Sequence, residues 1–245
     1  MPVEKVKRMV AGNGLIAKRF REYADDDRFL IFASGVSNSK STDQAAYERE
    51  FNLLKEYSEL NPGKVFVYFS TCSINDPIEN GSAYVSHKKN IEQYIQSNIG
   101  QYMIFRVSNL VGKTPNNNTI FNFIVQNIRQ GVQFDLWINA TRNLIDVDDF
   151  FSITDHILRN RLFLNRLINI ANPINNNVQE IVAAAEKLFD KKANYQPIPK
   201  GGSFNIDISD IRTIIEQLNI KFGEGYLETL LRKYYSLDEL QHCVS

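Results

Sequence analysis

Apolar and polar residues alternate along the first half of the chain in blocks that predict strands separated by helices. Short runs rich in Val, Ile and aromatic residues occupy residues 29–33, 64–69 and 102–107. A similar run opens residues 6–20, where it meets glycines and then a helix-like stretch, and residues 42–60 and 84–95 carry apolar side chains at helical spacing. This alternation predicts a parallel sheet with right-handed crossovers, which binds ligands beyond the carboxyl ends of its strands.

The second half of the chain is less regular. A polar Pro/Asn loop at residues 113–118 is followed by stretches that predict further helices, at residues 121–129, 150–159, 178–189, 208–217 and 226–235. Short strands are predicted at residues 136–138 and 144–147, and Asp148 is expected to cap the helix that begins at Phe150. The change of pattern after Gly112 indicates a second, smaller structural unit.

Composition narrows the class of protein. The 245 residues are 43% hydrophobic and 23% charged, which is typical of one large or two small globular domains and excludes disorder, collagen and a disulfide scaffold. Lys plus Arg equals Asp plus Glu at 28 each, so no basic field attracts nucleic acid or an anionic membrane. A small neutral or anionic ligand is the better expectation.

The apolar runs, the charged N-terminus and the two cysteines predict a cytoplasmic protein without a metal site. No apolar run approaches the length of a membrane span, and residues 1–8 are too charged for a signal peptide. The two cysteines, Cys72 and Cys243, fit a reducing compartment and have no metal-ligand spacing.

Two motifs carry candidate chemistry. Residues 12–17, G-N-G-L-I-A, match G-x-G-x-x-G/A between a strand and a helix, where small residues let a pyrophosphate approach the helix N-terminus. A tight turn without a ligand explains this motif as well. In Y-V-S-H-K, helical spacing places Tyr84 and Lys88 on one face, so that the ammonium lowers the pKa of the phenol and makes it usable as an acid or base near neutral pH.

The context of the Tyr-Lys pair adds a third group. Ser70 and Thr71 end the run at residues 64–69, and a hydroxyl there can bond the same substrate oxygen with which Tyr84 exchanges a proton. The simpler interpretation of both hydroxyls is a strand-end turn that bonds backbone.

Taken in order, several segments resemble the extended short-chain dehydrogenase/reductase superfamily, in its branch of nucleotide-sugar epimerases, dehydratases and reductases. The matching segments are the glycine turn, F-A-S-G-V-S, V-Y-F-S-T-C-S, Y-V-S-H-K-K-N-I-E, F-R-V-S-N-L-V-G and R-N-L-I-D-V-D-D. The resemblance implies a Rossmann-like doubly wound parallel sheet with a small C-terminal α/β lobe for the substrate. It places the cofactor domain at residues 1–112, with residues 141–170 returning to it, and the substrate lobe at residues 113–140 and 171–245.

The resemblance also implies roles for individual residues. The catalytic residues would be Thr71, Tyr84 and Lys88. NAD or NADP would contact Gly12, Asn13, Gly14, Leu15, Ile16, Ala33, Ser34 and Gly35, besides Tyr84 and Lys88. A nucleotide-sugar substrate would contact Ser70, Thr71, Cys72, Asn109 and Arg142, with Arg142 near its diphosphate. Glu92 belongs to the Tyr-Lys helix motif, and Asp149 would be structural. Family members commonly form homodimers through the Tyr-Lys helix and its neighbour.

The chain departs from the family in two places. The family normally has two further strand-helix units after the first helix, whereas only residues 21–28 intervene here. The strand end that reads the adenosine ribose is therefore missing, and Asp25, Asp26 and Asp27 are interpreted as a solvated loop. Cys72 and Ser73 replace the Asp-Glu pair that a dehydratase usually carries, which argues against elimination of water.

Other residues have simpler interpretations. His87 is adjacent to Lys88 and is expected to point away from the Tyr-Lys face, exposed. Trp137 is expected to pack within the small lobe, Cys72 to fill space, and the acidic run at residues 146–149 to cap a helix.

Three functions remain open on the sequence. The first is an NAD(P)-dependent oxidoreductase or epimerase of a nucleotide-activated sugar, with keto-sugar reduction favoured, in deoxysugar or surface-polysaccharide synthesis. The second is a catalytically impaired nucleotide-sugar-binding protein that keeps the fold. The third is a reductase of a small carbonyl compound, against which Arg142 argues, because such a substrate needs no diphosphate clamp.

Overall fold

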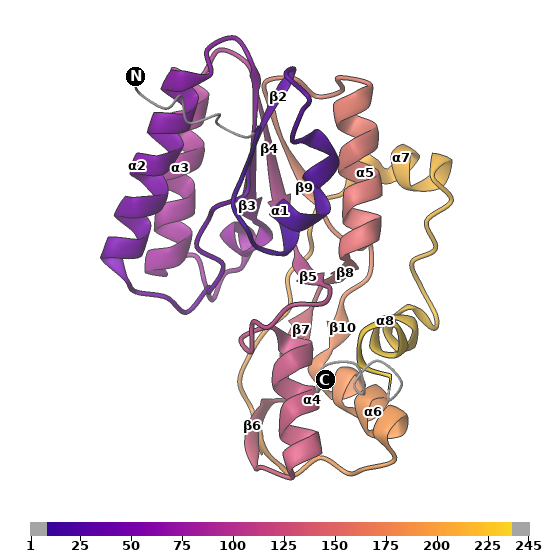
Figure 1. Cartoon of the computed structure of the whole chain (residues 1–245). Helices are drawn as coiled ribbons and strands as arrows, with labels where there is room; N and C mark the ends of the chain where they lie inside the picture. The colour runs from indigo at the N-terminus through magenta and orange to yellow at the C-terminus, as the bar shows by residue number, and fades with distance from the viewer. Residues whose placement is uncertain (1–8, 237–245) are drawn as a thin grey trace, which may run out of the picture.

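A computed structural model describes residues 9–236 of the chain (Figure 1). Its central sheet has five strands in the order β1 (Val10–Ala11), β2 (Phe29–Phe32), β3 (Val65–Thr71), β4 (Tyr102–Val107) and β9 (Arg166–Ile170). Every neighbouring pair is parallel, so all five carboxyl ends lie at one edge of the sheet. The predicted Rossmann-like α/β fold with a parallel sheet is confirmed.

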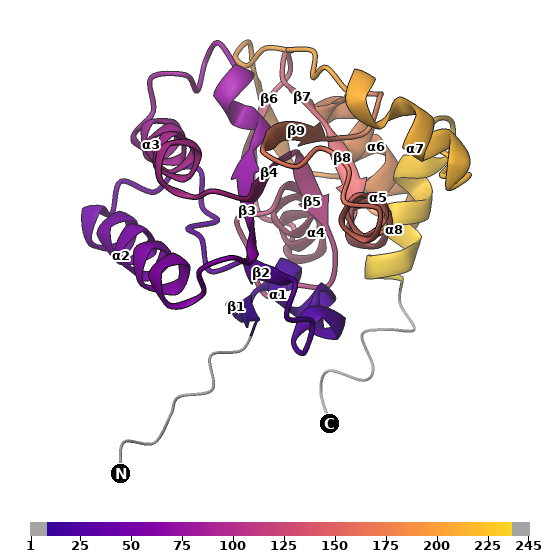
Figure 2. The same ribbon diagram turned by 90° about the horizontal axis from the view of Figure 1, so that it is seen from above.

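Helices cover both faces of this sheet, as the view from above shows (Figure 2). Side chains alternate along each strand, so Leu30 and Phe32 point to one face and Phe29 and Ile31 to the other. The first face packs against α2 (Gln44–Leu60) and α3 (Ala83–Asn98). The second packs against α1 (Leu15–Arg19), the 3₁₀ helix η1 (Arg21–Tyr23) and α5 (Val147–Arg159).

The first crossover differs in hand from the two that follow. The steps β1–β2, β2–β3 and β3–β4 all run in one direction across the sheet, but α1 lies on the opposite face from α2 and α3. The prediction of uniformly right-handed crossovers is therefore wrong for this sheet. The cause is local: residues 20–28 form only η1 and a turn, and Phe20 is fully buried among Phe69, Phe150 and Phe151, which fixes α1 on that face.

A second hydrophobic cluster lies beyond the carboxyl edge of the sheet (Figure 1). It is formed mainly by α4 (Ile120–Gln130), α6 (Val178–Phe189) and α8 (Tyr226–Tyr235). Three two-stranded pairs accompany it: β6 (Phe134–Trp137) with β11 (Tyr195–Ile198), β7 (Thr141–Arg142) with β10 (Asn176–Asn177), and β5 (Asn109–Val111) with β8 (Leu144–Asp146). The β5–β8 pair leads from the sheet into this lobe.

Two details differ from the sequence-based expectation. The 3₁₀ helix η3 (Ser209–Ile211) and α7 (Arg212–Gln217) pack into the core of the large sheet through Ile211, Ile214 and Ile215, although the sequence predicts them within the small lobe. Helix α5 begins at Val147 and is capped by Asp146, whose carboxylate accepts from the Asp148 amide at 2.8 Å, so Asp148 is not the cap. His242 and Cys243 lie outside the described residues.

Between residues 9 and 236, no helix is long and apolar enough to cross a membrane. The same residues contain no group of three or more His, Cys, Asp and Glu side chains arranged to hold a metal ion.

Candidate active site

The glycine turn opens the site at the carboxyl end of β1. Gly12 has a φ of +120°, and a Cβ there would lie 2.3 Å from the Ala33 carbonyl oxygen. Only glycine allows β1 and β2 to approach so closely at this point. Gly12, Asn13 and Gly14 are all exposed, and a Cβ on Gly14 would meet no atom within 4 Å. The turn is thus packed at its first glycine and open at its second.

Helix α1 follows this turn directly. Gly14 is its N-cap, and the N–H groups of its first turn, at Leu15 and Ile16, have no acceptor within the helix because they precede its first hydrogen bond. The Leu15 side chain lies beside Gly112, where a Cβ would come within 3.0 Å of both Leu15 and Val147. Gly112 therefore lets α1, α5 and the end of β5 meet beside the turn.

Thr71, Tyr84 and Lys88 come together beside β3, as the sequence predicts. Ser82 caps α3 by accepting from the Val85 amide at 3.2 Å, and this fixes the start of the helix that carries Tyr84 and Lys88. Thr71 is the last residue of β3; its hydroxyl accepts from the Ser73 amide at 3.1 Å and lies near enough to the Tyr84 phenol to lower the pKa of that phenol. All three side chains are buried, with exposures of 8%, 7% and 2%.

Burial has the largest effect on the proton affinity of Tyr84. Desolvation raises the pKa of the phenol, and this outweighs the opposing effects of the Lys88 charge and the nearby Thr71 hydroxyl, both of which lower it. Lys88 thus acts in the expected direction, but the phenol remains protonated near neutral pH. In this state Tyr84 is a proton donor.

A carboxylate that the sequence analysis missed lies beneath the pair. Glu50, from α2, is fully buried, and its Oε1 accepts from Lys88 Nζ at 2.9 Å. Tyr68 in β3 donates to the same oxygen at 2.8 Å and accepts from Lys88 at 3.0 Å. Burial alone would raise the pKa of Glu50, but Lys88, His87 and the Val36 amide together lower it to about 2. Glu50 is therefore a carboxylate at neutral pH.

His87 belongs to the same network. Its Nε2 lies 3.0 Å from Glu50 Oε2, its ring stacks on Tyr47 with centroids 4.4 Å apart, and its side chain is only 9% exposed. The expectation that His87 is exposed is wrong, because the turn of α3 that carries Lys88 inward directs His87 into the seam between α2 and α3.

Arg142 and Asn109 lie close together where the sheet meets the second lobe. The Asn109 side chain donates to the Asn143 carbonyl at 3.1 Å, and Arg142 donates to the Thr141 carbonyl at 2.8 Å. Burial lowers the pKa of Arg142, while the charges of Asp76 and Glu79, after β3, raise it. Arg142 makes no ion pair shorter than 4 Å within the described part of the chain, so no carboxylate there is bonded to its half-buried guanidinium.

The remaining candidate residues differ in whether their polar atoms are already hydrogen-bonded within the protein. Ser70 Oγ is buried without a hydrogen-bond partner in the described structure. Cys72 donates to the Arg106 carbonyl at 3.2 Å, and burial raises the pKa of its thiol to about 12, so it is inert as a nucleophile. Glu92 holds Arg106 by two hydrogen bonds, at 2.9 and 2.7 Å. Trp137 is 38% exposed, contrary to the expectation that it packs inside the lobe.

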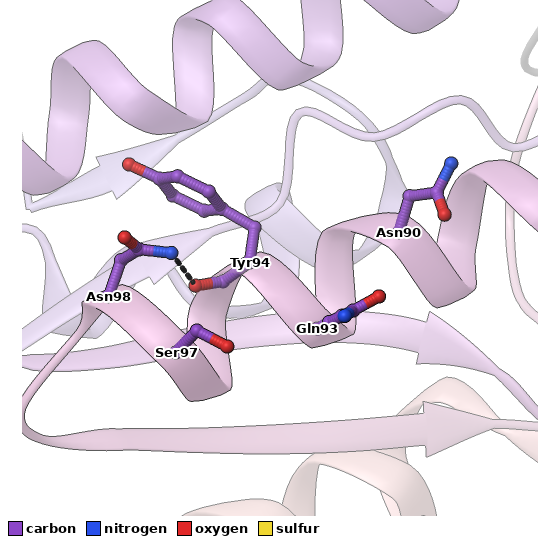
Figure 3. Close-up of a pocket in the computed structure, with 5 residues that line it drawn as sticks. All are labelled: Asn90, Gln93, Tyr94, Ser97 and Asn98. Atoms are coloured by element: carbon purple, nitrogen blue, oxygen red, sulfur yellow. Dashed lines mark hydrogen bonds between the residues drawn. The ribbon is translucent and has the colours of Figure 1, made fainter.

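A hollow on the protein surface lies on the other face of α3 (Figure 3). It is lined by Asn90, Gln93, Tyr94, Ser97 and Asn98, and Asn98 donates to the Tyr94 carbonyl at 2.8 Å. These positions alternate with the inward-facing residues of α3, so this hollow is separate from the Tyr84 site.

Comparisons with known proteins point to one family. The family profile described as the NAD dependent epimerase/dehydratase family matches residues 30–171, more than half of the chain. The match begins at β2 and leaves the glycine turn outside. A comparison with curated proteins gave no match.

Solved structures share the fold at low sequence identity. They include a dTDP-glucose 4,6-dehydratase from Bacillus anthracis in complex with NAD, which is 16% identical with a TM-score of 0.63 over 82% of this chain and 72% of that one. A UDP-N-acetylglucosamine 4-epimerase from Methanobrevibacter ruminantium, in complex with UDP-N-acetylmuramic acid, is 17% identical with a TM-score of 0.61 over 81% and 70%. A mutant UDP-glucuronic acid 4-epimerase from Bacillus cereus is 17% identical with a TM-score of 0.61 over 84% and 73%.

Proposed function

Because the chain belongs to the NAD-dependent epimerase/dehydratase family, we propose that it is an NAD(P)-dependent enzyme that acts on a nucleotide-activated sugar. The observation that carries the proposal is the assembly of Thr71, Tyr84 and Lys88 at the strand edge that also bears the glycine turn. A strand-end hydroxyl and a buried ammonium, both near enough to a phenol to lower its pKa, are the groups that a proton-transfer site requires.

Each of the three residues has a distinct role in the proposed reaction. The Tyr84 phenol donates its proton to a substrate carbonyl oxygen during reduction and takes a proton from the hydroxyl in the reverse direction. Thr71, whose hydroxyl lies near the phenol, orients the same substrate oxygen. Lys88 stabilises the phenolate that remains after transfer, because its ammonium is close and little screened by solvent. Bound NAD(P)H supplies the hydride that a keto group requires.

The residues at the carboxyl ends of β1 and β2 fit the nicotinamide half of the cofactor better than the adenosine half. The exposed glycine turn, the free amides of α1 and the segment Ala33 to Gly35 lie at one strand edge, as dinucleotide binding requires. Within the described residues β1 is the outer strand of the sheet, so no neighbouring strand end is available to read the adenosine ribose. We propose that the adenosine half is bound weakly or is completed by another subunit.

Of the possible reactions we favour keto-sugar reduction, in deoxysugar or surface-polysaccharide synthesis. Elimination of water needs a further acid or base beside the strand-end hydroxyl, and Cys72 and Ser73 occupy those positions. The raised pKa of the Cys72 thiol makes it unsuited to that work.

Titration with NADH and NADPH, followed by nicotinamide fluorescence, tests the proposed function. We expect the fluorescence of at least one of them to rise on binding. No binding up to millimolar cofactor, in every oligomeric state, would favour the alternative of a nucleotide-sugar-binding protein that keeps the fold without catalysis.

The Gly14→Ala variant separates a cofactor turn from a merely tight turn. A Cβ at Gly14 meets no protein atom within 4 Å, so folding should be unchanged, whereas a phosphate in contact with the backbone would be displaced. We expect NADH affinity to fall about tenfold or more, the equivalent of one lost charge-assisted contact. Gly81→Ala, which is equally open, is the control that should bind normally. Equal affinity of the two variants would contradict phosphate contact at Gly14.

Arg142 is the proposed ligand of the substrate diphosphate, with Asn109, Ser70 and Cys72 beside the sugar. Replacing Arg142 with glutamine should weaken the binding of UDP or dTDP, measured by calorimetry, about 10- to 100-fold, because a half-buried guanidinium bonds phosphate strongly. Arg159→Gln, at an exposed ion pair on α5, is the control. No binding of either nucleotide by the wild type would favour the third possibility, a reductase of small carbonyl compounds.

Two organisational proposals accompany this function. We propose that residues 1–112 and 141–170 act as the cofactor domain, and residues 113–140 and 171–245 as the substrate lobe, apart from the return of α7 to the large core. We also propose a cytoplasmic homodimer that pairs through α2 and α3.

A further inference from the structure

Glu50 is a buried charge with every lone-pair direction occupied. Its Oε1 accepts from Lys88 at 2.9 Å and from Tyr68 at 2.8 Å. Its Oε2 accepts from the Val36 amide at 2.7 Å and lies 3.0 Å from His87 Nε2. A carboxylate buried to this degree costs free energy unless it is fully bonded, and this one is. These partners come from three different segments of the chain: the stretch after β2, strand β3 and helix α3.

The contacts leave Lys88 with one uncommitted donor. An ammonium has three N–H bonds, and those of Lys88 include one to Glu50 and one to Tyr68 at 3.0 Å. The Lys88 nitrogen also lies 5.7 Å from the centre of the Tyr84 ring. The third N–H is therefore fixed in direction by the first two, without help from a ligand.

Glu50 holds the strand-end segment after β2 in the same way. Residues 33–36 contain no regular secondary structure, and the Val36 amide bonds Glu50. A Cβ on Gly35 would lie 2.9 Å from both Glu50 Oε1 and Lys88 Nζ, so the backbone rests directly on the ion pair. One carboxylate thus contacts both the lysine and the segment to which a nicotinamide site is assigned above.

We propose that Glu50 is a positioning residue of the active site, which fixes Lys88 and the segment Ala33 to Val36 in their binding geometry before the cofactor arrives. The inference rests on the proposed function, because it takes Lys88 and this segment as cofactor contacts. A positioning role makes a prediction that a merely stabilising ion pair does not. Loss of the Glu50 carboxylate should change NADH binding and the proton affinity of Tyr84, besides stability.

The electrostatic surroundings of Tyr84 provide a direct readout. Lys88 and Thr71 lower the pKa of its phenol, whereas burial, Glu50 and Tyr47 raise it. With Glu50 neutralised, the Lys88 charge is no longer offset, so the pKa of Tyr84 should fall. An exposed carboxylate on the same helix, Glu48, is screened by solvent and should have no such effect.

The experiment compares the Glu50→Gln and Glu48→Gln variants. Proteins labelled with ¹³C at the tyrosine Cζ are titrated by NMR, with the Tyr84 signal assigned through Tyr84→Phe. We expect the Tyr84 midpoint of Glu50→Gln to be lower than that of the wild type by about one pH unit or more, and that of Glu48→Gln to be unchanged. NADH affinity of Glu50→Gln should also fall about fivefold or more, because the site is no longer held in advance.

Each outcome bears on one proposal. An unchanged Tyr84 midpoint, or unchanged NADH affinity in a protein that does bind NADH, overturns the role of Glu50 and leaves the proposed function intact. If the wild type binds no NADH, the proposed function fails, and the role of Glu50 is decided by the Tyr84 midpoint alone.

A measurement on the wild type covers the case in which Glu50→Gln does not fold. An ammonium held by two partners exchanges its protons slowly, so Lys88 should give a resolved ¹⁵Nζ–¹H signal at neutral pH, assigned through Lys88→Met. Absence of that signal would mean that Lys88 is not fixed and would overturn the inference.

Discussion

Replacing Tyr84 with phenylalanine is expected to abolish turnover while leaving NADH binding unchanged. The phenol is the one acid in the Thr71–Tyr84–Lys88 cluster that is positioned to transfer a proton, and the substitution removes only its oxygen. Loss of a positioned general acid costs about 10²- to 10⁴-fold in rate. The aromatic ring remains, so the packing of α3 and the position of Lys88 should be preserved.

The control for this prediction lies on the same helix. Tyr94 is half-buried further along α3, where it packs on Phe51 of α2 and borders the hollow in Figure 3, and Tyr94→Phe should retain full activity. The measurement is the steady-state oxidation of NADH with a panel of keto nucleotide sugars, together with a fluorescence titration of each variant. A fully active Tyr84→Phe variant would mean that another group transfers the proton.

The sequence pattern closely predicts several helices and strands in both lobes. The strand Tyr102–Val107 and the helices Val178–Phe189 and Tyr226–Tyr235 have the predicted bounds, and α2 and α3 differ from theirs by at most three residues at either end. The helices bury one face and the strand is a nearly continuous run of buried apolar residues, so side-chain hydrophobicity alone reveals them.

The strand β9 was missed for the opposite reason. In R-L-I-N-I the polar Arg166 and Asn169 interrupt a short apolar run, and the strand borders the sheet beside β4. Pairing with β4 and packing of Ile168 and Ile170 into the large core define it, and both are tertiary effects. The hand of the first crossover is likewise set by packing, through the burial of Phe20.

The motif residues of the site were predictable, but the residue beneath them was not. Tyr84 and Lys88 follow a spacing that chemistry explains, whereas Glu50 belongs to no motif. One signal was available: Glu50 lies on the apolar face of α2, three residues after Tyr47 and four before Leu54, where a charged side chain requires a partner. Which partner it has depends on how α2 packs on α3, which the sequence does not state.

A second large effect is expected on stability, from the Gly12→Ala variant. At φ +120° an alanine is strained, and its Cβ would lie 2.3 Å from the Ala33 carbonyl oxygen, a contact that only movement of β1 or β2 can relieve. We expect the free energy of unfolding to fall by about 2–5 kcal/mol, measured by urea denaturation.

Substitutions at two other glycines show how much of that loss comes from backbone strain and how much from the clash of the Cβ with Ala33. Gly63 has a φ of +82° but nothing within 4 Å of its Cβ position, so Gly63→Ala carries backbone strain alone and should cost about 1–2 kcal/mol. Gly14→Ala carries neither penalty and should leave stability unchanged. Equal losses for Gly12→Ala and Gly63→Ala would mean that the Ala33 carbonyl yields easily. If the losses differ as expected, packing of β1 against β2 is enough to require Gly12. Any need for glycine that comes from the cofactor must then be tested at Gly14, because the fold itself does not require glycine at that position.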